Sequence, residues 1–174
     1  MAHKLHRRWL ILILLLVGFF LDGSLSLVLS PSLFAGDLQV APQLLLMEMV
    51  LATFVAPDEP WLFWLALFFG FFYDLFYTGI IGQYTLIVPV VYLLTRYLLT
   101  YFQQKFVYRL AANVIAVLLA QVILYALAVF FALSNQNVWA FISDVLAPTI
   151  LFNIILFAIC YWPSQKLLDL MYRE

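Results

Sequence analysis

Residues 9–30 read WLILILLLVGFFLDGSLSLVLS, a run of 22 residues in which Asp22 is the single charge. A membrane-spanning helix needs about 20 consecutive, mostly apolar residues. The whole chain has the same character, with 67% hydrophobic residues, 10% charged residues and a mean hydropathy of +1.09. A soluble chain still exposes much of its surface and carries about 25% charged residues. We therefore expect an integral membrane protein.

Five further segments share this apolar character, and clusters of proline, glycine and polar residues separate them. The expected helices cover about residues 9–30, 38–56, 61–77, 84–102, 110–133 and 142–162. Continuous apolar runs favour helices over the alternating pattern of a β-barrel. The alternative for residues 9–30 is a cleaved signal peptide, but the run resumes after Asp22 and no small-x-small site follows at the usual distance. The sequence predicts an all-α bundle of six transmembrane helices in a single domain, residues 1–174.

Basic residues set the expected orientation, because Lys and Arg collect on the cytoplasmic side of membrane proteins. With six spans and a cytoplasmic N-terminus, all eight basic residues fall inside. If the short segment 38–56 did not cross, five of the eight would fall outside. The asymmetry predicts a multi-pass protein with both termini in the cytoplasm. The eight residues are Lys4, Arg7, Arg8, Arg96, Lys105, Arg109, Lys166 and Arg173.

Four acidic residues fall inside the expected membrane helices, where a charge is costly. Asp22 and Asp74 each lie 13 residues after a tryptophan that begins a helix, which puts both roughly 20 Å from the cytoplasmic face. Glu48 lies at a similar depth, and Asp144 opens the last helix near the outer surface. The orientation places no basic residue at that level.

These acids have one structural and two functional interpretations. The structural one is hydrogen bonding to Ser24, Thr53 or helix ends, with Asp144 as a helix cap. A functional alternative is an outward-facing cavity or a contact with a partner. The other alternative, a proton or cation path, has less support because no relay or basic partner is visible.

A row of small residues, Ala112, Ala116 and Ala120, follows one face of the fifth helix. Small residues at this spacing let helix backbones approach closely. Packing within the chain is the simplest interpretation, and contact between two copies in a homodimer is the alternative. Three amides are expected to bond across helices: Asn113, Gln121 and Asn153.

Enzymatic templates do not fit this chain. Both histidines, His3 and His6, lie in the basic N-terminal tail, and Cys160 is the single cysteine, so neither a metal-ligand set nor a Ser-His-Asp triad is expected. The sequence also lacks a Gly-rich nucleotide loop with its lysine. A net charge of −1 without a basic tract gives no sign of nucleic-acid binding. We expect no enzymatic activity and no cofactor.

Residues 70–86, GFFYDLFYTGIIGQYTL, resemble the signature of the rod shape-determining protein MreD family. That signature has a glycine, an aspartate four residues later, and then glycines before an apolar helix. Gly70 and Asp74 share one helix face, and Gly79 and Gly82 are expected to form a tight turn. Together with Asp22, Glu48 and Asp144, these four residues are the candidate partner or cavity residues.

The resemblance implies a non-enzymatic scaffold of the cell-wall elongation machinery, placed in the bacterial cytoplasmic membrane. The implied partners are an MreC-like bitopic protein, a peptidoglycan glycosyltransferase and transpeptidase, and the actin-like MreB. The alternative is the similar six-helix substrate-binding subunit of an energy-coupling-factor vitamin transporter. Such subunits share an Ala-x-x-x-Ala pattern in helix one, and residues 10–28 contain no alanine.

Overall fold

Every regular element in the computed structural model is helical within the described residues, which are 2–33, 38–134 and 136–169. The prediction of an all-α protein is therefore confirmed, and each expected segment contains helix. The elements are α1 (Ala2–Val28), α2 (Ser30–Leu33), α3 (Leu44–Val55), α4 (Trp61–Tyr73), the π-helical turn η1 (Asp74–Thr78), α5 (Gln83–Leu98), α6 (Phe106–Phe130), α7 (Val138–Ala140), the π-helical turn η2 (Phe141–Leu146) and α8 (Ala147–Asp169).

Four of the described helical stretches are long and apolar enough to cross a membrane. They are Arg8–Val28, Trp61–Thr78, Phe106–Phe130 and Val138–Leu168. The helices of the other two expected spans are shorter, with 12 residues in α3 and 16 in α5. Residues 38–43, expected to begin the second span as a helix, are not helical.

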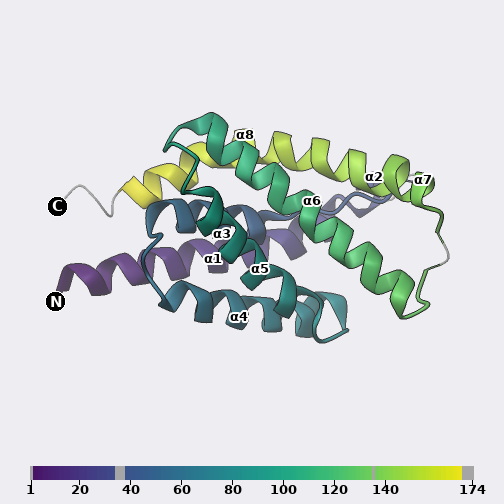
Figure 1. Cartoon of the computed structure of the whole chain (residues 1–174), viewed down its shortest axis with the longest axis horizontal. Helices are drawn as coiled ribbons and strands as arrows, with labels where there is room; N and C mark the ends of the chain where they lie inside the picture. Colours follow the sequence, from purple (N-terminus) through teal and green to yellow (C-terminus); the bar gives the residue numbers. More distant parts are fainter. Residues whose placement is uncertain (1, 34–37, 135, 170–174) are drawn as a thin grey trace.

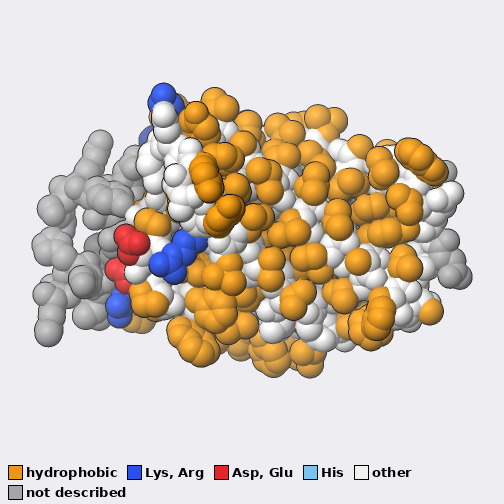
Figure 2. Space-filling view, viewed as in Figure 1, with side chains coloured by type: hydrophobic (Ala, Val, Ile, Leu, Met, Phe, Trp, Pro, Cys, Tyr) orange, Lys and Arg blue, Asp and Glu red, His pale blue; other side chains and the backbone are white. Residues whose placement is uncertain are grey.

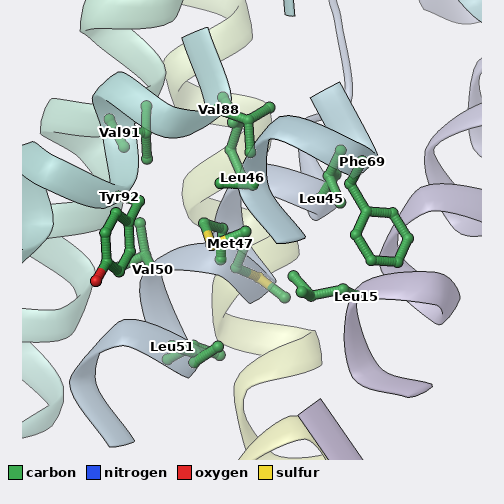
Figure 3. Packing of buried hydrophobic residues seen from close by; sticks show 14 of the residues in the cluster. Leu15, Leu45, Leu46, Met47, Val50, Leu51, Phe69, Val88, Val91 and Tyr92 are labelled. Carbon is green, nitrogen blue, oxygen red and sulfur yellow. The ribbon is translucent and has the colours of Figure 1, made fainter. Parts of the chain in front are cut away.

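Helix α3 forms the centre of the bundle and contacts α1, α5, α6 and α8 (Figure 1). All twelve of its residues are buried. A helix that is apolar on every side is stable only when other elements surround it. Figure 3 shows Leu45, Leu46, Met47, Val50 and Leu51 of α3 in one cluster with Leu15 of α1, Phe69 of α4, and Val88, Val91 and Tyr92 of α5.

The outer surface of the bundle is apolar. Side chains such as Phe20 of α1, Phe68 of α4, Leu118 of α6 and Ile155 of α8 are exposed. In the view of Figure 2, hydrophobic side chains cover most of the bundle, and the charged side chains gather at the end where α1 begins and α8 ends. Exposed apolar surface of this extent suits lipid and not water. The fold is that of a membrane protein.

The charged end joins elements that are distant in sequence. Arg8 Nη2 of α1 lies 3.8 Å from Glu59 Oε2 in the α3–α4 turn. Arg109 of α6 donates from Nη1 to Tyr161 Oη of α8 (3.3 Å). Other basic residues are found at the ends of helices here: Arg96 in the last turn of α5, Lys105 before α6, and Lys166 in the last turn of α8. Arg173, which the orientation argument also used, lies outside the described residues.

Candidate functional site

Asp74, the acid of the glycine motif, is fully buried where η1 meets α5. Its Oδ2 accepts hydrogen bonds from the backbone N–H groups of Gly82 (2.8 Å) and Thr85 (3.0 Å), and from Thr85 Oγ1 (2.7 Å). Its Oδ1 accepts from the Tyr84 N–H (2.7 Å). These donors belong to the first turn of α5, where backbone N–H groups lack helical partners and the helix dipole is positive. Asp74 therefore caps the next helix, and this explains how a carboxylate is buried there without a cation.

The glycines of the motif make this cap possible. A Cβ on Gly70, one turn before Asp74, would collide with the Tyr84 carbonyl oxygen and lie 2.9 Å from Thr85 Cα. Gly79 and Gly82 have φ angles of +69° and +115°, which side-chain-bearing residues rarely adopt. The close approach of α4 to α5 and the turn between them thus need glycine, and the four motif residues meet at one junction.

Asp22 caps the N-terminus of α3, as Asp74 caps the N-terminus of α5. The Leu44 N–H donates to Asp22 Oδ1 (2.5 Å), and the Leu45 N–H donates to Oδ2 (3.0 Å). The expected bond to a helix end is therefore present. Of the two hydroxyl side chains also expected to bond an acid, Ser24 is exposed, and Thr53 donates instead to the Met49 carbonyl of its own helix (2.7 Å).

Glu48 lies one turn further along α3 and is only 4% exposed. Its Oε1 accepts from Ser164 Oγ of α8 (2.6 Å). Its Oε2 is buried without a hydrogen-bond partner. Glu48 therefore differs from the two aspartates, because the described residues satisfy only one of its two oxygens.

Residues 38–43 lie against η2 and α8, which accept hydrogen bonds from the backbone N–H group of every second residue from 39 to 43. The Gln39 N–H donates to the Asp144 carbonyl (2.8 Å), the Ala41 N–H to Thr149 Oγ1 (3.3 Å), and the Gln43 N–H to Asn153 Oδ1 (2.9 Å). Asn153 Nδ2 donates to the Ala41 carbonyl (2.8 Å). The sequence analysis named Asn153 as a cross-helix donor but missed Thr149, whose hydroxyl gave no local signal.

The expectation that Asp144 caps the last helix is wrong. The helical stretch begins at Val138, and Asn137 is its N-cap, accepting from the Trp139 N–H (3.5 Å). Asp144 lies within η2, where its side chain accepts from Ser143 Oγ (2.5 Å). It is separate from the glycine motif and from α3.

The alanine row of α6 faces the interior of the bundle. Ala112, Ala116 and Ala120 are all buried, and α6 contacts α3, α5 and α8. This burial supports close packing within one chain and leaves the row unavailable to a second copy.

A cavity of about 560 Å³ opens at the end of the bundle opposite the charged end. Four of its lining residues are aromatic: Tyr73, Phe76, Tyr77 and Tyr84. Neither Asp22 nor Asp74 lines it, because both carboxylates are turned to helix ends. The full lining is Gly23, Ser26, Leu27, Tyr73, Phe76, Tyr77, Thr78, Gln83, Tyr84 and Leu124. Among the described side chains, no group of three His, Cys, Asp or Glu is placed to hold a metal ion.

The comparison with protein families matches residues 4–171 of the 174-residue chain to the rod shape-determining protein MreD. The chain belongs to the MreD family. Searches of curated proteins and of solved structures returned no match. The MreD family has a role in determining rod shape and is associated with the MreB/MreC shape machinery. The comparisons give no support to the vitamin-transporter alternative.

Proposed function

We propose that this MreD-family protein is a non-enzymatic scaffold of the cell-wall elongation machinery in the bacterial cytoplasmic membrane. It contacts an MreC-like bitopic protein, and through the assembly it works with a peptidoglycan glycosyltransferase and transpeptidase and with MreB. The observation that carries the proposal is the family match over residues 4–171.

The use of the buried acids supports a scaffold over a catalyst. The carboxylate oxygens of Asp22 and Asp74 accept hydrogen bonds from the backbone N–H groups of α3 and α5. The two acids therefore stabilise the helix bundle and are not presented to a substrate. The long helices present apolar side chains outward, a surface that lies in lipid and can also contact another membrane helix. A partner with a membrane helix fits such a surface.

We also propose six crossings with both termini in the cytoplasm. The 12 residues of α3 span about 18 Å. Residues 38–43 add up to about 20 Å if extended, which brings the segment to the roughly 30 Å of a bilayer core. Non-helical backbone is tolerated at that depth only when it is buried in protein, and the bonds to Thr149 and Asn153 meet this condition.

Reporter fusions test the orientation. Fusions after Glu174 and within residues 103–108, where α6 begins, should report a cytoplasmic location, while fusions near Asp37 and Asn135 should report an external one. Asp37, Asn135 and Glu174 lie outside the described residues. An external C-terminus would overturn the six-span model.

Depletion and co-purification test the function. Depleting the protein in a rod-shaped host should give rounded or widened cells, and expression from a plasmid should restore the rod. Purification in mild detergent should retain the MreC-like protein. The scaffold proposal fails if that protein separates both in mild detergent and in cross-linked membranes. Turnover of a lipid-linked wall precursor by the purified chain would contradict the non-enzymatic assignment.

A further inference from the structure

The lipid-facing surface has a hollow of about 200 Å³ between α1 and α8, with α3 as its floor. Glu48 and Ser164 provide the oxygen atoms among its side chains, and none of the described residues that line it is basic. The lining residues are Leu14, Val17 and Leu21 of α1, Leu44 and Glu48 of α3, and Cys160, Pro163, Ser164 and Leu167 of α8.

The close contact between α1 and α3 brings Glu48 to this hollow. A Cβ on Gly18 would lie 3.0 Å from Glu48 Cγ and 3.3 Å from the Leu44 carbonyl oxygen, so the absence of a side chain at Gly18 lets the helices meet here. Ser164 holds one carboxyl oxygen, and the other has no partner. Burying a polar atom without a hydrogen bond is costly, and more so in a membrane.

We propose that this hollow is the docking site for a transmembrane helix of a partner protein, which inserts a hydrogen-bond donor side chain against Glu48. A lipid acyl chain would fill the hollow but leave the Glu48 oxygen unpaired. A helix that carries a donor fills the space and satisfies that oxygen. The last torsion of a glutamate side chain is soft, so a small rotation turns the oxygen toward the donor. The inference rests on the proposed function, because it requires a partner with a membrane helix.

The single cysteine of the chain allows a direct test in membranes. Cys160 lines the hollow, so cysteines placed one at a time along the partner's membrane helix should form disulfides with it under mild oxidation. Cross-linking should recur every three to four positions, as one face of a helix does. The control combines Cys160→Ala with Leu118→Cys, which moves the thiol to a 43% exposed position on α6.

The cross-linking results separate the two proposals. Disulfides at Cys160 with none at the α6 control support docking in the hollow. Disulfides only at the control overturn the docking site and leave the scaffold function standing. If no disulfide forms at either position and the partner also fails to co-purify, both proposals fall.

Substitution of Glu48 tests the hydrogen bond itself. Glu48→Leu removes the carboxyl oxygen to which the partner's donor would bind. Capture, meaning the amount of partner that co-purifies with the protein in mild detergent, should therefore fall about threefold or more. The melting temperature of the isolated protein should change little, because the removal of an unpaired buried oxygen offsets the loss of the acceptor of the Ser164 hydroxyl. In Glu48→Gln the amide N–H can donate to Ser164 Oγ, because a hydroxyl also accepts, and the amide oxygen stays available for the partner's donor, so capture should be largely restored. Unchanged capture with Glu48→Leu would overturn the proposal.

A second variant keeps the test decisive if Glu48→Leu lowers the melting temperature. Val17→Trp fills the hollow from a position on α1 that is 44% exposed and leaves the Glu48–Ser164 bond in place. It should reduce capture as strongly as Glu48→Leu does. Normal capture by Val17→Trp would show that the partner does not enter the hollow.

Discussion

The cap formed by Asp74 makes a quantitative prediction for Asp74→Asn. The carboxylate accepts through both oxygens, from the Tyr84 N–H on Oδ1 and from the Gly82 and Thr85 N–H groups on Oδ2. An amide has one acceptor oxygen, so in either orientation at least one of these backbone N–H groups faces another donor. Losing a hydrogen bond to a charged group and leaving its donor unsatisfied costs about 3 kcal/mol.

The free energy lost should appear as a lower melting temperature. For a chain of 174 residues, about 3 kcal/mol corresponds to a fall of about 6–12 °C. The assay is thermal unfolding of the purified variant and wild type in the same detergent. The control is Asp144→Asn, at a partly exposed carboxylate that accepts from the neighbouring Ser143, which should shift the midpoint by less than about 2 °C.

One result would refute this reasoning. If Asp74→Asn melts like wild type yet fails to restore rod shape at matched protein levels, the charge of Asp74 serves a partner or ligand and the cap is secondary. A variant that is both less stable and less abundant would instead show that the acid acts through the fold.

Three further variants test the same architecture. Asp22→Asn should lower the melting temperature by less than Asp74→Asn does, because Asp22 accepts only two backbone bonds. Gly70→Val should prevent the close contact of α4 with α5, so folded protein should be nearly absent after size-exclusion chromatography. Asn153→Leu should release residues 38–43 from α8, and hydrogen exchange of their amides should become at least tenfold faster while that of α6 stays unchanged.

The sequence located the helices well because each is encoded locally. Long apolar runs separated by polar or glycine-containing turns are the signal for membrane helices, and α1, α4 and α6 fall where such runs occur. The glycine motif likewise predicted a junction, since Gly70, Asp74 and the two turn glycines lie within 13 residues of one another.

What the sequence could not supply are the contacts between distant segments. The donors that Asp22 accepts from lie 22 and 23 residues further along the chain, beyond the reach of any local capping rule. Residues 38–43 continue an apolar run, yet Thr149 and Asn153, more than 100 residues away, compete for their backbone groups and replace helix. The unpaired oxygen of Glu48 depends on the packing of α1, α3 and α8 together.

The position of α3 has a consequence for how the protein is made. Helix α3 leaves the ribosome early, but α5, α6 and α8, which enclose it, are synthesised later. At 12 residues, with Glu48 in its sequence, it is a poor match for lipid on its own. The hydrogen bonds of residues 38–43, which precede α3, also form only after Thr149 and Asn153 have been synthesised. The contacts that enclose α3 are therefore complete only after α8, the last of these helices, has joined the bundle.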